Sequence, residues 1–203
     1  MSRARALGGG PHALACAARL PERIAAAGTI APLAPFDADG LDWLASQGTE
    51  NVVEWRAAVA GPAALQPLLE AAAPGLASVT ASNIAPTLGD LLSPLDRASL
   101  TGDRAEWAAA SFRAGVSPGI WGWYDDDLAF VHPWGFELAA IRVPVTLWQG
   151  EQDRMVPVSH GRWLASRIPG VRARILPDHG HVSLVVGSLE PVLDDLAERA
   201  SAG

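Results

Sequence analysis

Apolar and polar positions along the chain divide it into three zones. In the first, an Ala-rich helical pattern runs from Pro11 to about Leu20, and a weak strand pattern follows over 25–30. A proline at the first helical position presets the backbone angle there, and Pro32 and Pro35 end the strand. The first zone therefore predicts one helix followed by one strand.

The middle zone, residues 36–136, changes to a helical period. Its spacing predicts helices at about 40–46, 50–60, 63–73 and 103–114, separated by Gly and Pro. Six of the eight tryptophans fall here. We expect them to be packing aromatics of a small helical subdomain, and the alternative is that some wall an apolar substrate pocket. They are Trp43, Trp55, Trp107, Trp121, Trp123 and Trp134.

The last zone, residues 137–203, alternates short strands with helices. Strand patterns at 143–148 and 173–176 alternate with helical patterns at 157–168 and 182–200. Such alternation indicates parallel pairing and right-handed crossovers. The expected fold class is α/β, with a parallel sheet flanked by helices and an inserted helical segment.

Composition excludes several function classes. A net charge of −7 with scattered arginines argues against a nucleic-acid surface. Cys16 is the single cysteine, which rules out an internal disulfide and fits a reducing interior. No apolar run is long enough to span a membrane, and the N-terminus lacks the apolar core of a signal peptide. We expect a cytoplasmic protein without membrane or nucleic-acid partners.

Candidate chemistry is concentrated in two segments, Leu147–Asp153 and Leu176–His181. Each is a strand-like run that ends in a glycine-containing loop with one titratable side chain. A carboxylate that orients an imidazole, with both on loops after parallel strands, is two thirds of a nucleophilic triad. The alternatives are a turn or capping role for Asp153 and a backbone-bonded loop histidine for His181.

With these zones in place, the chain resembles the C-terminal two thirds of a bacterial α/β-hydrolase with a helical cap. The resemblance rests on five stretches, of which the last two are the most specific. It implies a core at 1–35 and 137–203 without its N-terminal strands, and a cap at 36–136. The stretches are Gly8–Ala15, 27–32, Gly122–Phe130 with Pro133–Phe136, Pro144–Pro157 and Gly180–Leu184.

The resemblance assigns Asp153 as the triad acid and His181 as the general base, in the family's chain order of nucleophile, acid and histidine. Counting back from the glycine run places the nucleophile position on Leu7 and the first glycine of the elbow on Arg5. Leucine has no nucleophilic atom. The amide of Gly8 can still serve as one oxyanion donor.

The family's sheet has further strands before the elbow, so we expect a truncated product. The implied lineage chemistry is hydrolysis of a small, apolar ester- or amide-type substrate, without cofactor or metal. With Leu7 at the nucleophile position, we expect this chain to be inactive. The alternatives are a non-catalytic binding module with an unidentified protein partner, and an epoxide or haloalkane hydrolase lineage, which needs an Asp nucleophile.

Other reactive side chains have simpler interpretations. We expect Cys16 to be a packing residue and His12 to have a structural or capping role, and Ser2 has no evident path to the site. His179 and His181 form a His-x-His pair, but no third metal ligand is evident. Three consecutive aspartates, 125–127, predict a solvated helix turn rather than a cation site.

Overall fold

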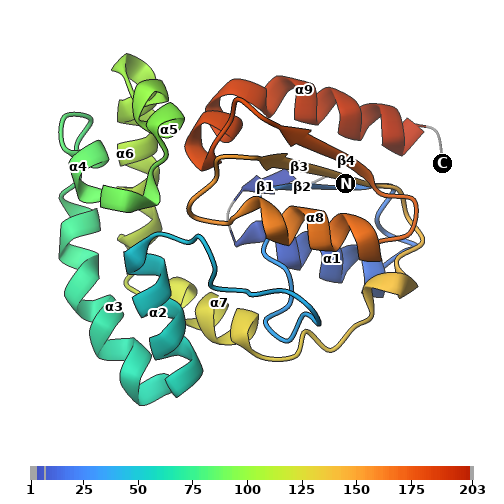
Figure 1. The fold of residues 1–203 in the computed structure, drawn as a ribbon, viewed down its shortest axis with the longest axis horizontal. Coiled ribbons are helices and arrows are strands. Elements are labelled where there is room, and N and C mark those ends of the chain that lie inside the picture. The colour runs from blue at the N-terminus through green and yellow to red at the C-terminus, as the bar shows by residue number, and fades with distance from the viewer. Residues whose placement is uncertain (1–3, 7, 202–203) are drawn as a thin grey trace.

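The computed structural model describes residues 4–6 and 8–201 and contains a four-stranded parallel sheet (Figure 1). The strands lie side by side in sequence order, and the register aligns Ile30 with Trp148. This sheet confirms the α/β prediction. The strands are β1 (Ala4–Ala6), β2 (Ala27–Ile30), β3 (Val145–Gly150) and β4 (Arg172–Leu176).

Helices cover both faces of the sheet. Helices α1 (Gly9–Arg19) and α8 (Val158–Arg167) lie on one face, and α9 (His181–Ser201) lies on the other (Figure 1). Every residue of β2 and β3 is buried, as expected for central parallel strands with both faces covered. One apolar core lies between the sheet and α1 with α8, and a smaller one lies under α9.

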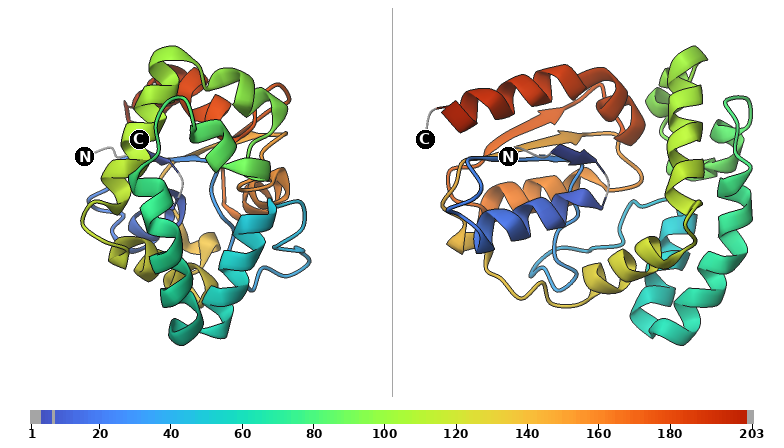
Figure 2. Two further views of the ribbon diagram at one scale, coloured as in Figure 1. Left: turned by 90° about the vertical axis from the view of Figure 1, so that its left-hand side faces the viewer. Right: turned by 180° about the vertical axis from the view of Figure 1, so that it is seen from behind.

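The remaining helices stand beyond the carboxyl ends of the strands (Figure 2). Two further apolar clusters hold them together, and these clusters also include Met155 and Val156 from the loop after β3. Their bounds are α2 (Thr49–Ala60), α3 (Pro62–Ala77), α4 (Ile84–Thr87), α5 (Pro94–Ser99), α6 (Gly102–Val116) and α7 (Trp121–Val131). Two 3₁₀ turns complete the structure, η1 (Gly89–Leu91) and η2 (Leu138–Ala140).

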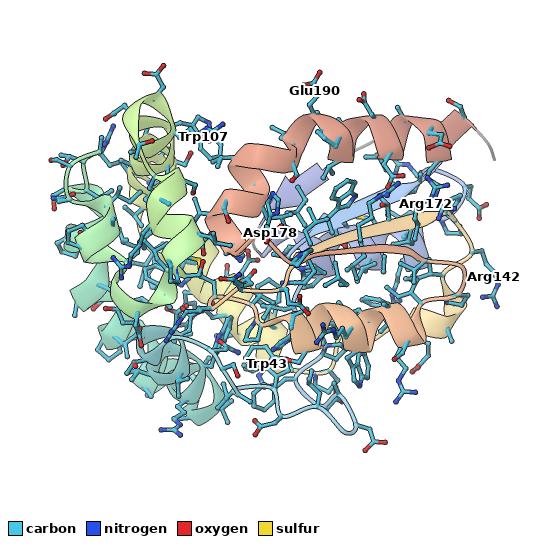
Figure 3. All side chains as sticks on the ribbon, turned by 45° about the horizontal axis from the view of Figure 1, so that its top comes forward. Trp43, Trp107, Arg142, Arg172, Asp178 and Glu190 are labelled. Atoms are coloured by element: carbon cyan, nitrogen blue, oxygen red, sulfur yellow. The ribbon has the colours of Figure 1, made fainter. Side chains whose placement is uncertain are left out.

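The predicted helices at 50–60, 63–73 and 103–114 correspond to α2, α3 and α6. The prediction of a helix at 40–46 is wrong. Gly40 and Ser46 both have positive φ, and the chain between them forms successive turns. The apolar side chains there do face the core: Trp43, labelled in Figure 3, is buried, and its ring packs edge-on against that of His160 in α8. Their helical spacing therefore reflects burial in turns rather than a helix.

None of the described helices combines the length and apolar character needed to cross a membrane. The first helix approaches the sheet closely at Gly10, where a Cβ would lie 2.8 Å from Cβ of Pro32. Glycine at this position therefore lets α1 pack against the chain leaving β2. This contact fixes the start of α1, and with it Gly8, relative to the ends of the strands.

Candidate functional site: an acid–histidine pair at the strand ends

Asp153 lies in the loop after β3, and its carboxylate is supplied with donors on both oxygens. The amides of Met155 and Val156 each donate to Oδ1 at 2.8 Å. Nε2 of Gln149, the side chain of a β3 residue, donates to Oδ2 at 3.2 Å. Asp153 is 4% exposed. These donors hold the carboxylate of Asp153 in one fixed orientation.

His181 is the first residue of α9, and its ring meets that carboxylate. Nδ1 of His181 lies 2.8 Å from Oδ2 of Asp153, and the imidazole is 2% exposed. Since the carboxylate accepts, Nδ1 carries the proton and Nε2 is left as the basic nitrogen. Nε2 is buried and has no hydrogen-bond partner among the described residues. Two groups that sequence reasoning assigned together are thus in direct contact.

The electrostatic surroundings favour a protonated imidazole at His181. Burial lowers the pKa of His181, but the charge and hydrogen bond of Asp153 and the charge of Asp96 outweigh it, so the pKa is raised overall. A base that takes up a proton at Nε2 is therefore stabilised as an imidazolium by the carboxylate behind it. This is the arrangement that general-base catalysis by histidine uses.

A second carboxylate, that of Asp96 in α5, holds the histidine loop in place. Asp96 is fully buried, and it accepts hydrogen bonds from the amides of His181 (3.1 Å) and Ser183 (2.8 Å). The hydroxyl of Ser183 donates to it at 2.8 Å. The first-turn amides of a helix are donors without an intrahelical acceptor, and an anion at this end is favourable. Asp96 therefore caps α9 from a different part of the chain.

Two glycines let these loops come together. A Cβ on Gly180 would overlap the carboxylate of Asp96, and a Cβ on Gly150 would overlap the carbonyl of Gly180. Glycine is thus required at both positions. Sequence reasoning did not find Asp96 or Gln149. The pattern Ser93-Pro-Leu-Asp96 does mark a helix start, and both bonds of its capping box are present, but it carries no sign of the partner on α9.

Leu7, which the resemblance places at the nucleophile position, lies outside the described residues. Its neighbour Gly8 precedes α1, and a Cβ there would lie 3.1 Å from the ring of Phe130 and 3.3 Å from Oδ2 of Asp126. An oxyanion held by the amide of Gly8 would therefore form close to a carboxylate of α7. Like charges at short distance repel, which weakens this position as an oxyanion site.

The sequence agrees with this geometry, since the family model of the alpha/beta hydrolase fold matches residues 9–188. The chain belongs to the α/β-hydrolase fold family. The matched range includes both Asp153 and His181. No curated protein matches the sequence at a significant level.

Solved structures with the same fold include bacterial proteins that are named hydrolases. A hydrolase from Pseudomonas aeruginosa PA01 superposes with a TM-score of 0.55 at 22% identity, covering 93% of this chain and 61% of the other. The enol-lactonase from Burkholderia xenovorans LB400 gives 0.58 at 18% identity, with 98% and 64% covered. An α/β-hydrolase fold protein from Nakamurella multipartita gives 0.58 at 22%, with 98% and 68% covered. At these identities the likeness shows the fold, and this chain spans about two thirds of their length.

This α/β-hydrolase chain has a cavity of about 770 Å³ between the helices and the strand ends. Its volume is typical of small-molecule sites. Leu33, Met155 and Val156 come from the sheet side, and the other walls come mainly from α2, α3, α6 and α7. Because Met155 and Val156 are the residues whose amides bind Asp153, the cavity adjoins the acid loop.

The six tryptophans of residues 36–136 differ in whether they pack in a core, line the cavity or do neither. Trp43 and Trp55 are buried, as packing aromatics are, and Trp55 also lines the cavity together with Trp123. Trp107 and Trp121 fit neither interpretation, because both are more than half exposed. Trp134 is partly buried against the core beneath the sheet.

The predicted solvated turn at 125–127 is half wrong. These residues do form a helix, α7, but Asp127 is only 3% exposed and lines the cavity opposite Glu54 of α2. Burial, followed by the charge of Glu54, raises the pKa of Asp127 to about 10. Burial also raises the pKa of Glu54, in spite of a 2.8 Å hydrogen bond from Nε1 of Trp123. Two positions along a helix are roughly half a turn, so Asp125 faces outward and Asp127 faces inward.

The structure also tests the roles predicted for Cys16, His12 and His179. Cys16 is exposed, so the expectation of a packing residue is wrong, because its side of α1 faces away from the sheet. His12 does not cap its helix: its Nε2 lies 2.8 Å from Oδ1 of Asp126. Within residues 4–6 and 8–201 no three His, Cys, Asp or Glu side chains form a metal-binding group, and His179 has no such partners. Ser2 lies outside the described residues.

Proposed function

We propose that this chain carries the acid and the base of a Ser–Asp–His hydrolase triad and is deficient in hydrolysis because Leu7 occupies the nucleophile position. The observation that carries the proposal is the contact between His181 and Asp153, whose remaining basic atom, Nε2, has no partner among the described residues. Such a pair needs a hydroxyl or thiol to deprotonate, and leucine has neither.

The chemistry of the lineage follows from these groups. In an ancestor with serine at position 7, Nε2 of His181 would take the hydroxyl proton as oxygen attacked an acyl carbon. Asp153 would hold the Nδ1–H tautomer and stabilise the imidazolium, and the same proton would then pass to the leaving group. The oxygen of the tetrahedral intermediate would lie near the amide of Gly8.

We propose an ester- or amide-type compound of small size as the substrate class of the lineage. The cavity beside the acid loop has the volume for such a molecule, and its walls are largely apolar. One structural neighbour is named an enol-lactonase, and a lactone is an ester. We assign residues 36–136 as the cap over this cavity, and 1–35 with 137–203 as the core that carries the triad residues.

Hydrolysis of a short-chain p-nitrophenyl ester tests the proposal. The chain is expected to show no turnover above the rates of its Asp153→Asn and His181→Ala variants, since loss of a triad nucleophile lowers turnover by a factor on the order of 10⁶. A rate that either substitution abolishes would show that another nucleophile operates. A chain with both Arg5→Gly and Leu7→Ser should gain activity that His181→Ala removes.

A second candidate is a non-catalytic binding module, and one observation favours it. The cavity is lined by described residues, chiefly of α2, α3, α6 and α7, and binding of a ligand there needs no nucleophile. A chain that has lost turnover can therefore still bind a ligand. The chemistry of the cavity wall indicates which ligand that is.

A further inference from the structure

The charged side chains that line the cavity, among the described residues, are all acidic. Four carboxyl side chains line it, from Glu50, Glu54, Asp126 and Asp127, and no Arg, Lys or His of the part of the chain that the structure describes does so. The remaining walls are largely apolar and include the aromatic rings of Trp55, Trp123, Phe112 and Phe130. Carboxylates surrounded by aromatic faces attract cations and disfavour anions.

Asp127 is the least satisfied group in this wall. It is 3% exposed, and its Oδ2 is buried without a hydrogen-bond donor among the described residues. The carboxyl of Glu54 is close enough to exchange a hydrogen bond with Asp127 only if one of the two is protonated. Burying a carboxyl without a donor is costly, so the free protein retains a proton on this pair.

A cation that carries N–H groups is the ligand that would replace the proton shared by Asp127 and Glu54. It would supply the donor that Asp127 lacks and the positive charge that lets both carboxyls ionise. A bare metal ion fits less well, because the described residues offer no group of three ligands and the cavity is about 770 Å³ with largely apolar walls. An organic group attached to the cation would fill the rest of that space.

We propose that the cavity binds a small organic primary ammonium ion, with its N–H groups donating to Asp127 and Glu54 and its apolar part against Trp55, Trp123 and Phe130. This site does not require turnover at Asp153 and His181. It can therefore be present whether or not the chain hydrolyses esters, and the two proposals fail separately.

Binding of benzylamine, measured by isothermal titration calorimetry and by quenching of tryptophan fluorescence, tests the site. Benzyl alcohol and benzoate are the neutral and anionic probes of matched size. Benzylamine is expected to bind at least about tenfold more tightly than benzyl alcohol, because one charge-assisted hydrogen bond accounts for that difference. Equal binding of the amine and the alcohol, or no binding of the amine, would overturn the proposal.

Substitutions locate the ammonium group. Asp127→Asn and Glu54→Gln keep the size of each side chain and remove its charge, and each should weaken benzylamine binding by about tenfold or more. The matched control is Asp125→Asn, two positions away on α7, where the side chain is exposed and does not line the cavity. Its affinity should equal that of the unmodified protein. A site elsewhere would leave all three variants alike.

Proton release gives a test that needs no variant of the acid pair. Benzylamine binding should release up to one proton, seen as a dependence of the binding heat on the ionisation heat of the buffer, and affinity should rise from pH 6 to pH 8. The other ionisable groups at this wall are Glu50 and Asp126, and His12 contacts Asp126. A His12→Gln variant should still release the proton. Binding without proton release would show that the pair is not the site.

Discussion

Two buried carboxylates in this molecule, Asp153 and Asp127, have the same side chain and nearly the same exposure but opposite surroundings. Asp153 receives two backbone amides, an amide side chain and an imidazole. Asp127 faces another carboxyl, and its Oδ2 has no donor among the described residues. Burial alone therefore does not determine the charge of a carboxyl. The donors that the fold brings to it decide whether it is ionised.

Removing the well-supplied carboxylate should have the largest effect. Asp153→Ala leaves two amides and Nδ1 of His181 buried without an acceptor, so we expect the free energy of unfolding to fall by about 3–5 kcal/mol. Chemical denaturation measures the change. Asp178→Ala, on the exposed loop before α9, is the control and should change stability by less than about 0.5 kcal/mol. A loss at Asp153 as small as the control's would mean that the donors are satisfied elsewhere.

The comparison extends to the buried histidines. His160 accepts from the amide of Ala34 through Nδ1, and its Nε2 contacts the carbonyl of Trp43, so no carboxylate supports a charge on it. Burial lowers the pKa of His160 to about 4. The unfolded chain therefore takes up a proton near pH 6.5 that the folded chain refuses until about pH 4. Stability is lost as the pH falls through this window.

The expected loss from His160 between pH 7 and pH 4 is about 3 kcal/mol. It is measured as the difference in unfolding free energy between the unmodified protein and His160→Gln, which does not titrate. Parallel pH curves for the two proteins would contradict it. In the folded state the His181 imidazole should lose its proton at higher pH than that of His160, which NMR titration of the ring signals can follow.

At the poorly supplied carboxyl, the expected effect is a slope of stability against pH. Since the pKa of Asp127 is raised to about 10, the folded state holds a proton that the unfolded chain loses near pH 4. Stability from this group is full at low pH and falls as the pH rises, with a slope of up to about 1.4 kcal/mol per unit. Asp127→Asn should remove this slope between pH 5 and 8, whereas Asp125→Asn should keep it. Equal slopes in all three proteins would refute a buried, protonated Asp127.

The sequence predicted the acid–histidine pair because the signal is local. Each residue follows a strand-like run and a glycine, and parallel strands bring such loops to one edge of a sheet. Asp96 could not be found in this way, because its partner amides lie 85 and 87 positions away. The burial of the Asp127 side chain could not be predicted from the sequence either. Three consecutive aspartates have no periodicity, so the face that is buried depends on how α7 packs against α2.

The contact between Asp96 and α9 has a mechanical consequence. Helix α5 stands among the helices beyond the strand ends, yet its carboxylate is bound to two amides at the start of α9. The acid loop is fastened too, because the carbonyl of Arg154 accepts from Gly48 and that of Met155 accepts from Asn51 of α2. Because α5 and α2 are both hydrogen-bonded to the loops at the strand ends, these helices cannot move away from the strands as one rigid body without breaking those bonds. Any motion that opens the cavity to a ligand must therefore either leave both contacts in place or break them together.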